Sequence, residues 1–307
     1  AGFIGSYLSR FLCYFNDNLW DGTASFFGVD VGIAAGDTGA ALGEEMKKRR
    51  DFMPLGWNIA IDPPLDRLST AKIDYVLHMA SIAAPAIYKK HPLETIHVNV
   101  NGTENVLKWA SGADIKSMVH FSSSEVYGDP LVIPTPETYW GNVSPNGWRA
   151  CYDESKRLSE AICMIYRDKF SVPVKILRPH NIYGPCQRLD DGRVIPQLMS
   201  AMLEDKPFTI YGDGSATRSY CYISDAVTQM LSVLLNGTSG EVYNIGDANS
   251  EVNLIEIADL AHQAADRPGY SRFDEDSPMI KDAPTRRKPD MTKIMRIAPP
   301  PEIGLAD

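Results

Sequence analysis

The chain has 307 residues, a formal net charge of −9 and 44% hydrophobic residues. This length suits one large domain or two closely packed domains around a substantial core. The acidic balance provides no basic surface for nucleic acid, and no apolar run is long enough for a membrane span. We therefore expect partners that are neither nucleic acids nor membranes.

The five cysteines are scattered, odd in number and free of any C-x-x-C motif. This usage predicts neither a disulfide framework nor a zinc site, and we expect no metal. Reduced thiols are typical of cytoplasmic proteins, so we predict that location. The apolar stretch 2–15 carries Arg10 and lacks a basic start, which argues against a signal peptide. Because the sequence begins within a motif, Ala-Gly-Phe-Ile-Gly, we expect further residues upstream.

Short apolar runs alternate with amphipathic helical patterns up to about residue 180. Strands are expected at 25–30, 75–79, 117–122 and 172–177, and helices at 6–15, 92–111 and 149–170. Such alternation predicts an α/β fold in which a Rossmann-type, doubly wound parallel sheet carries helices on both faces.

The rhythm changes after Pro179, where Gly, Pro and charged residues become frequent and the strands shorten. Residues 220–235 and 241–245 indicate a return to the sheet layer, and 254–265 a further helix. The pattern predicts a second, smaller α/β domain built from discontinuous segments. We place the larger domain at 1–179 and 219–246, and the smaller one at 180–218 and 247–307.

Gly2 and Gly5 precede the first predicted helix with the spacing G-x-x-G. Glycine lets the backbone approach a pyrophosphate, and a helix N-terminus offers free N–H groups and a positive dipole end. Asp30 ends the next predicted strand, where a carboxylate accepts hydrogen bonds from a ribose diol and repels a 2′-phosphate. The carboxylate of Asp30 therefore favours NAD over NADP. The alternative interpretation of the two glycines is an ordinary helix cap. The expected contacts are Gly2, Phe3, Ile4, Gly5, Asp30 and, at the adenine end, Asp62.

Tyr152 and Lys156 lie four residues apart near the start of a long predicted helix, so they share one face. A tyrosine ordinarily ionises near about pH 10, but a neighbouring ammonium favours the phenolate and makes it a usable base. The Y-x-x-x-K pattern is common by chance. Here it lies just beyond a predicted strand ending in Ser122-Ser123-Ser124, which favours a hydride-transfer pair over a surface pair.

Further motifs follow in a fixed order along nearly the whole chain. They are AGFIG (1–5), the acid at 30, HMAS (78–81), NVNGTENVL (99–107), SSSEVYGDP (122–130), YDESK (152–156), RPHNIYGP (178–185), TIYGDGSATRSYCYISD (209–225) and YNIG (243–246). This set resembles the extended short-chain dehydrogenase/reductases that act on nucleotide sugars. The resemblance implies that the larger domain binds NAD, retained through the cycle, and that the smaller one binds a nucleotide sugar.

The same resemblance implies more specific contacts and an assembly. It implies a homodimer built through the helices near 94–111 and 150–168. It also places further residues against the cofactor, in addition to Tyr152 and Lys156. These residues are Met79, Ala80, Ser81, Asn99 and Ser122.

Three stretches indicate the subclass. Ser124 stands where the family's 4,6-dehydratases carry an Asp, and Glu125 where its 4-epimerases carry a small hydroxyl residue. The Ser-Glu pair resembles the UDP-glucuronate decarboxylases, also called UDP-xylose synthases. His180 departs from them, since phenylalanine is commoner there, and a packed, hydrogen-bonded histidine is its plain interpretation. The second stretch with this likeness comprises 137–145 with 149–152, and the third comprises 190–194 with 286–290.

The resemblance implies NAD-dependent oxidative decarboxylation of UDP-glucuronate, through a 4-keto intermediate, to UDP-xylose. Tyr152 would take the proton of the C4 hydroxyl, and Ser123 would bind the same oxygen. Ser124 and Glu125 would bound the carboxylate or relay a proton at C5. The residues expected to hold the substrate are Arg287 at its carboxylate, Arg193 and Arg218 at its diphosphate, and Tyr88, Asn181 and Tyr211.

Two alternatives stay open. On the same scaffold, another NAD-dependent nucleotide-sugar 4-epimerase, dehydratase or 4-ketoreductase is the enzyme alternative, although Glu125 and Arg287 favour decarboxylation. The non-enzyme alternative is a protein that senses dinucleotides with a dead site. Such proteins typically lose the tyrosine–lysine pair, whereas this chain keeps Tyr152 and Lys156.

Overall fold

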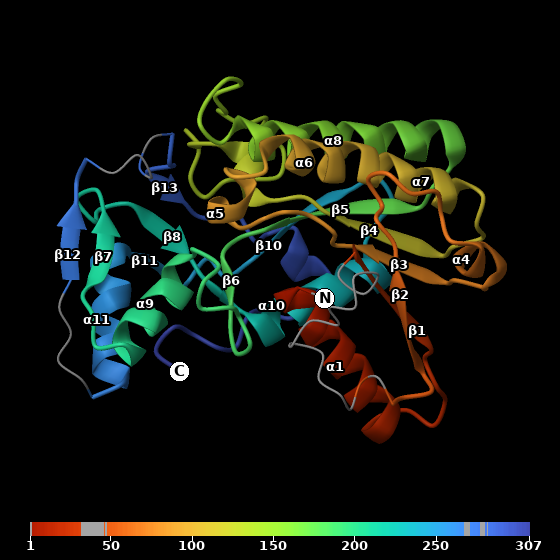
Figure 1. Ribbon diagram of the computed structural model, residues 1–307, viewed down its shortest axis with the longest axis horizontal. Helices are drawn as coiled ribbons and strands as arrows, with labels where there is room; N and C mark the ends of the chain where they lie inside the picture. The colour runs from red at the N-terminus through yellow and green to blue at the C-terminus, as the bar shows by residue number, and fades with distance from the viewer. Residues whose placement is uncertain (1, 32–45, 47, 267–270, 277–279, 281) are drawn as a thin grey trace.

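The computed structural model describes residues 2–31, 46, 48–266, 271–276, 280 and 282–307, so that Ala1 of the first motif lies outside it. Within these residues, a parallel sheet with helices on both faces adjoins a smaller group of short strands and helices (Figure 1). The predicted α/β, Rossmann-type class is therefore confirmed. No helix of the described part is both long and apolar enough to cross a membrane.

The main sheet consists of four parallel strands in the order β10–β5–β4–β3 among the described residues. Beside them, β1 and β2 form a two-stranded parallel sheet in which Asp30 pairs with Gly56. The sequence predicted all of these strands except β2, where Pro54 interrupts the apolar pattern. Their bounds are β1 Phe26–Asp30, β2 Phe52–Gly56, β3 Tyr75–His78, β4 Ser117–Phe121, β5 Val174–Pro179 and β10 Val242–Ile245.

Helices cover both faces of this sheet (Figure 1). One face carries α6 (Pro92–His97), a π-helical turn η1 (Val98–Gly102), α7 (Thr103–Ser111) and α8 (Ala150–Phe170). The opposite face carries α1 (Phe3–Asn18) and α10 (Ile223–Asn236). Because α1 begins at Phe3, Gly5 lies inside its first turn, not before the helix as the sequence had suggested.

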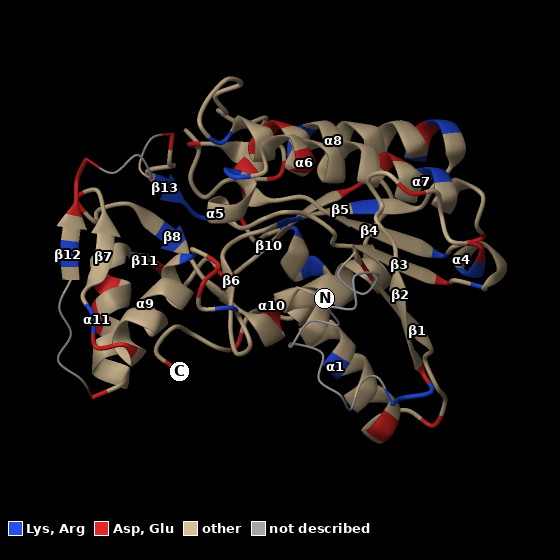
Figure 2. Ribbon diagram, in the orientation of Figure 1, with Lys and Arg blue, Asp and Glu red and all other residues tan. Residues whose placement is uncertain are grey.

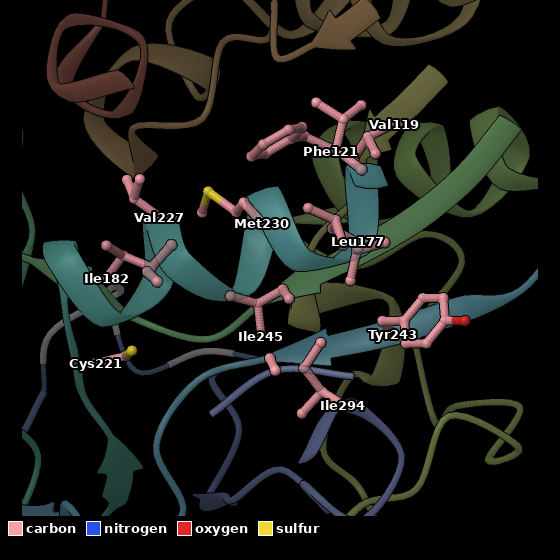
Figure 3. Packing of buried hydrophobic residues seen from close by; sticks show 14 of the residues in the cluster. Val119, Phe121, Leu177, Ile182, Cys221, Val227, Met230, Tyr243, Ile245 and Ile294 are labelled. Atoms are coloured by element: carbon pink, nitrogen blue, oxygen red, sulfur yellow. The ribbon is translucent and has the colours of Figure 1, made fainter. Parts of the chain in front are cut away.

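The core explains why the strands are apolar along their whole length. Val119 and Phe121 of β4 pack with α10 residues such as Met230 on one face (Figure 3). Met118 of β4 packs with Leu107 on the other face. Since successive side chains of a strand point to opposite faces, a sheet covered on both sides needs continuous apolar strands.

The smaller group of elements follows β5 and has its own core. There Leu198 and Ala258, from two helices, pack with Phe208 and Ile210 of β7. The three-stranded sheet β11–β8–β13 and the pair β7–β12 belong to this part, whereas Ile182 and Cys221 of the pair β6–β9 pack in the core of the main sheet. The bounds are β6 Ile182–Tyr183, α9 Val194–Leu203, β7 Phe208–Tyr211, β8 Thr217–Ser219, β9 Cys221–Tyr222, β11 Glu251–Asn253, α11 Leu254–Ala264, β12 Ser271–Asp274 and β13 Arg286–Arg287.

The second half follows the predicted pattern only in part. Residues 241–245 supply β10, but 223–236 form α10, which packs on the sheet and is not a layer of strands. The expected helix near 254–265 is α11. The domain boundaries stay a prediction; Ile294 and Ala298, placed with the smaller domain, pack in the core of the main sheet. Short elements elsewhere are α4 Asp66–Thr70, α5 Pro85–Tyr88, η2 Ser124–Tyr127 and η4 Ile294–Arg296.

Candidate active site

The start of α1 lies against the carboxyl ends of the central strands. Phe3 and Ile4 pack on the cluster that contains Phe121, the last residue of β4, and Met79, which follows β3. Gly2 precedes the helix in extended conformation and is exposed, and among the described residues no atom would lie within 4 Å of a Cβ at this position. The N–H groups of the first turn, which have no acceptor within the helix, are therefore well placed for an anion.

Asn99 ties the loop after β3 to α8. Its side chain accepts a hydrogen bond from Ser81 Oγ at 2.7 Å and donates one to Ser155 Oγ at 2.9 Å. Asn99 is buried within the π-helical turn η1. Ser81 and Asn99, both predicted to contact a cofactor, thus hydrogen-bond to each other and fix the Met79–Ser81 loop, which includes Ala80, next to the helix that carries Lys156.

Tyr152 and Lys156 are both buried on α8, one turn apart. Lys156 Nζ donates to the carbonyl oxygen of Phe121 at 2.7 Å and lies 6.0 Å from the centre of the Tyr152 ring. Burial lowers the pKa of Lys156 to about 8. Burial also raises the pKa of Tyr152 to about 12, although a hydrogen bond with Ser123 opposes that rise.

The lowered Tyr152 pKa that the sequence suggested is therefore not found for the chain alone, and the part of Lys156 in favouring the phenolate stays a prediction. Low dielectric surroundings disfavour both charged forms, and burial outweighs the influence of neighbouring charges on Tyr152. Tyr152 is a phenol that holds its proton firmly. It can act as a base only when further positive charge or hydrogen bonds favour the phenolate.

Tyr88 supports the Tyr152 ring from the side of α5. The two rings stack with centres 5.1 Å apart and an angle of 12° between their planes. Tyr88 is buried, and within the described part of the chain its hydroxyl has no hydrogen-bond partner. Burial raises the pKa of this hydroxyl. A buried polar group without a partner favours binding of a ligand that supplies one.

Ser122 has a role that the sequence did not predict. Its hydroxyl donates to Glu160 Oε1 at 2.5 Å, and Arg178 binds the two oxygens of Glu160 at 2.9 and 2.6 Å. The side chain of Ser122 therefore links the end of β4 to α8 and, through Glu160, to β5. The hydroxyl can still accept a hydrogen bond, and the expected contact with a cofactor stays a prediction.

Glu125 is held by two arginines in the turn η2, directly after β4. Arg287 Nη1 and Nη2 bind Oε1 and Oε2 at 2.8 and 2.7 Å, and Arg149 Nη2 lies 2.5 Å from Oε2. Arg287 Nη1 also reaches Ser124 Oγ at 3.5 Å. Burial alone would raise the pKa of Glu125, but the charges of Arg149 and Arg287 hold it well below its usual range. Glu125 is thus a lasting anion with both oxygens occupied, poorly suited to relay a proton.

Arg287 reaches this site from the smaller group of strands, next to Arg218. The two arginines are direct partners in the parallel pair β13–β8, where Lys and Arg gather in Figure 2. Arg218 donates to the carbonyl oxygens of Thr217 and Pro284 at 2.7 and 2.6 Å. Burial, aided by the charge of Arg287, lowers the pKa of Arg218 to about 10, so it stays charged at neutral pH. Two neighbouring buried guanidinium groups favour an anionic ligand.

Three other predicted substrate residues lie in the same half of the molecule. Asn181 donates to the carbonyl oxygen of Ser219 at 2.9 Å, next to Arg218. Arg193 forms an ion pair with Asp191 at 3.3 Å, and its charge lowers the pKa of Tyr152, which indicates that it lies near that ring. Tyr211 ends β7, and no hydrogen bond or ion pair between described residues joins its side chain to the others.

Asp30 and Asp62 lie on the side of β1 and β2. Asp30 ends β1, as the prediction of a ribose contact requires. Asp62 is exposed in the loop after β2, and its carboxylate accepts a hydrogen bond from the backbone N–H of Asn58 at 3.3 Å. Its assignment to the adenine end stays a prediction.

Sequence reasoning missed Arg149 and Asp153 as members of the site. Arg149 is the residue before α8 and pairs with Glu125, while Asp153 Oδ2 lies 3.7 Å from Arg149 Nε. The available signal was their spacing: they stand four apart on either side of Tyr152, so a helix places them on one face.

The chain is similar in sequence to known UDP-glucuronic acid decarboxylases. UDP-glucuronic acid decarboxylase 1 from Arabidopsis thaliana is 40% identical over 222 residues, which cover 72% of this chain and 50% of that protein. UDP-glucuronic acid decarboxylase 5 from the same plant is 37% identical over 226 residues, covering 74% and 64%. The chain spans about half the length of the first of these relatives.

Solved structures agree on the fold. UDP-glucuronic acid 4-epimerase from Bacillus cereus, in complex with UDP-glucuronic acid and NAD, matches with a TM-score of 0.85 and 26% identity. The match covers 100% of this chain and 93% of that chain. The sequence model of the NAD dependent epimerase/dehydratase family matches residues 31–246. The chain therefore belongs to the NAD dependent epimerase/dehydratase family.

Proposed function

We propose that this protein converts UDP-glucuronate to UDP-xylose by NAD-dependent oxidation at C4 followed by decarboxylation. One observation carries the proposal: a buried tyrosine–lysine pair lies beside a site in which Arg287, Arg149 and Arg218 are gathered around Glu125. The first feature suits oxidation of a sugar hydroxyl, and the second suits a sugar that carries a carboxylate. The similarity to UDP-glucuronic acid decarboxylases supports the same substrate.

The residues fit NAD. The first turn of α1, from Phe3 to Gly5, would hold the pyrophosphate, Asp30 a ribose, and Tyr152 with Lys156 the nicotinamide end. The open space at Gly2 and the free N–H groups of that turn support this placement. When bound, NAD⁺ supplies the hydride acceptor at C4 and returns the hydride at the end of the cycle.

The chain's own residues account for the proton and the carboxylate. Tyr152, which bound NAD⁺ would favour as the phenolate by adding positive charge to the site, takes the C4 hydroxyl proton while Ser123 binds the same oxygen, which leaves a ketone at C4. The C4 ketone is beta to the carboxylate, so the bond to the carboxylate breaks and its electron pair passes into an enolate as carbon dioxide leaves. A proton from water then adds at C5, and Tyr152 returns its proton to O4. Arg287 and Arg218 orient the anion throughout.

The deciding experiment measures carbon dioxide and product mass. Purified protein with NAD⁺ and UDP-glucuronate should release carbon dioxide and give a product lighter by that mass, whereas UDP-glucose should release none. The fit to a UDP-glucuronic acid 4-epimerase gives a second candidate, 4-epimerisation of the same substrate. A product of unchanged mass would favour the epimerase and refute the decarboxylase.

We also propose a cytoplasmic homodimer formed through α6, α7 and α8. Leu93 on α6 and Leu158 and Ile165 on α8 are large apolar side chains with exposed fractions of 65%, 50% and 49%. Burying them against a second copy removes apolar surface from water. Light scattering should give the mass of a dimer, and replacing Leu158 and Ile165 together by Glu should give a monomer. The five free cysteines suit a reducing compartment.

A further inference from the structure

Two buried carboxylates share Arg149. Glu125 Oε2 lies 2.5 Å from Arg149 Nη2, and Asp153 Oδ2 lies 3.7 Å from Arg149 Nε. The Asp153 and Arg149 side chains are only 9% and 14% exposed. Among the described residues, Asp153 Oδ1 and Arg149 Nε have no hydrogen-bond partner. Asp153 is therefore a buried carboxyl with one distant ion-pair partner, in contrast to Glu125, which both arginines bind directly.

The charged groups that act most strongly on Asp153 come from this site and from its own helix, α8, where Cys151 also interacts with it. Glu125 of η2 and Glu154 of α8 are its acidic neighbours, while Arg149 before α8 and Arg287 of β13 are its basic ones. Burial, followed by the charge of Glu125, raises the pKa of Asp153 to about 7 against the two arginines. The hydroxyls of Tyr88 and Tyr152, which also lie close, stay protonated because burial raises their pKa values.

The remaining members of the site keep their charge through neutral pH. The arginines hold the pKa of Glu125 well below its usual range, and the pKa of Arg218, about 10, leaves that guanidinium protonated. Asp153 is thus the member whose charge changes near neutrality. When it is protonated, Arg149, Arg287 and Arg218 face one carboxylate; when it is ionised, they face two.

We propose that Asp153, through Arg149, sets the net charge of this arginine site and thereby its affinity for a sugar carboxylate. This inference rests on the proposed function, because it takes a carboxylate-bearing nucleotide sugar as the ligand. When Asp153 is ionised, it is a second anion next to Arg149 and weakens the attraction of the arginines for the ligand's carboxylate. When Asp153 is neutral, more of the positive charge of the arginines is available to that carboxylate. Asp153 is a positioning residue with a specificity role, since it acts through Arg149.

The test is calorimetric binding of UDP-glucuronate and UDP-xylose at pH 6 and pH 8. All proteins carry Tyr152→Phe to prevent turnover. The variant that also carries Asp153→Asn is compared with the protein that keeps Asp153. With Asp153 present, the Kd for UDP-glucuronate should rise from pH 6 to pH 8 by about threefold to tenfold more than the Kd for UDP-xylose, which lacks the carboxylate. Asp153→Asn should remove this difference and bind UDP-glucuronate tightly at both pH values.

Glu154→Gln is the matched control. Glu154 is the next residue on α8, but its side chain is 39% exposed and pairs with Arg157 at 3.4 Å, so the same loss of charge occurs towards solvent. This variant should keep the pH dependence of the protein with Asp153. A merely structural Asp153 would alter both ligands equally at both pH values, and that result would overturn the inference.

The outcomes separate this inference from the proposed function. If UDP-glucuronate binds and Asp153→Asn retains the pH dependence, the inference fails while the proposed function stands. The same holds if UDP-xylose shows the same dependence as UDP-glucuronate. If UDP-glucuronate binds none of these proteins and the protein with Tyr152 intact releases no carbon dioxide from it, the proposed function fails and the inference fails with it.

Discussion

Lys156 and Arg287 are both buried cations of one site, but their surroundings differ. Lys156 donates to the Phe121 carbonyl, and burial lowers its pKa to about 8. Arg287 is 2% exposed and binds both oxygens of Glu125. Burial without a bound counterion favours the neutral form, whereas a bidentate counterion preserves the charge. Burial thus favours the neutral forms of Tyr152 and Lys156, whereas the arginine region holds fixed charge.

Tyr152→Phe should have the largest effect on chemistry and a small one on folding. Removing the phenol removes the proposed acceptor of the C4 proton, so kcat should fall about 10²- to 10⁴-fold while ligand affinity changes little. Loss of the Ser123 hydrogen bond should lower the free energy of unfolding by only about 1 kcal/mol. Steady-state kinetics and urea denaturation check both values. Activity close to that of the natural protein would break the assignment of proton transfer to this region.

Glu125→Ala should have a large effect on folding stability, in contrast to Tyr152→Phe. It leaves Arg149 and Arg287 buried without their shared carboxylate, so the free energy of unfolding should fall by about 3–5 kcal/mol. Urea denaturation measures the change, and Glu154→Ala on the exposed side of α8 is the control, expected to change it by less than about 1 kcal/mol. Equal stabilities for the two variants would show that the arginine region holds no structural charge.

The sequence predicted the first of these regions better than the second. Tyr152 and Lys156 stand four apart on one helix, and the strand ending at Phe121 was recognisable from its apolar run, so local periodicity places the pair. The arginine region joins residues far apart in the chain: Arg287 pairs with Glu125, 162 residues earlier, and the backbone next to Arg287 is held by a hydrogen bond from Thr135 N–H to the Lys288 carbonyl oxygen. No local pattern encodes that pairing, and Arg287 was placed at the site by family resemblance alone.

Burial was the other quantity that the sequence did not supply. The i, i+4 spacing of Tyr152 and Lys156 suggested a lowered tyrosine pKa, but burial of the Tyr152 side chain raises it. Likewise, Asp153 was visible in the motif YDESK, but its place beside Arg149 depends on how the loop before α8 folds over Glu125. Local spacing fixes which residues share a face, and tertiary packing decides their electrostatics.

His180→Phe should have the smallest effect at neutral pH, and it sharpens the comparison because His180 is a buried group that stays neutral. Its Nδ1 lies 3.2 Å from the Arg178 carbonyl oxygen, while Nε2 has no hydrogen-bond partner among the described residues. Phenylalanine has a similar shape, so one hydrogen bond is lost and one unsatisfied nitrogen is removed. The free energy of unfolding should change by no more than about 1 kcal/mol at pH 7.5.

At acidic pH, the free energy of unfolding should differ between the natural protein and the His180→Phe variant. Burial, aided by the charge of Arg287, lowers the pKa of His180 to about 3, below the ordinary value of about 6.5. Between these values the unfolded chain binds a proton that the folded one does not, so His180 stabilises the fold above pH 6.5 and loses that contribution as the pH falls. The natural protein should therefore lose about 1.4 kcal/mol per pH unit more than His180→Phe below pH 6.5, by urea denaturation. Parallel losses in the two proteins would show that His180 takes up a proton in the folded state and would place it with the fixed charges of the arginine region.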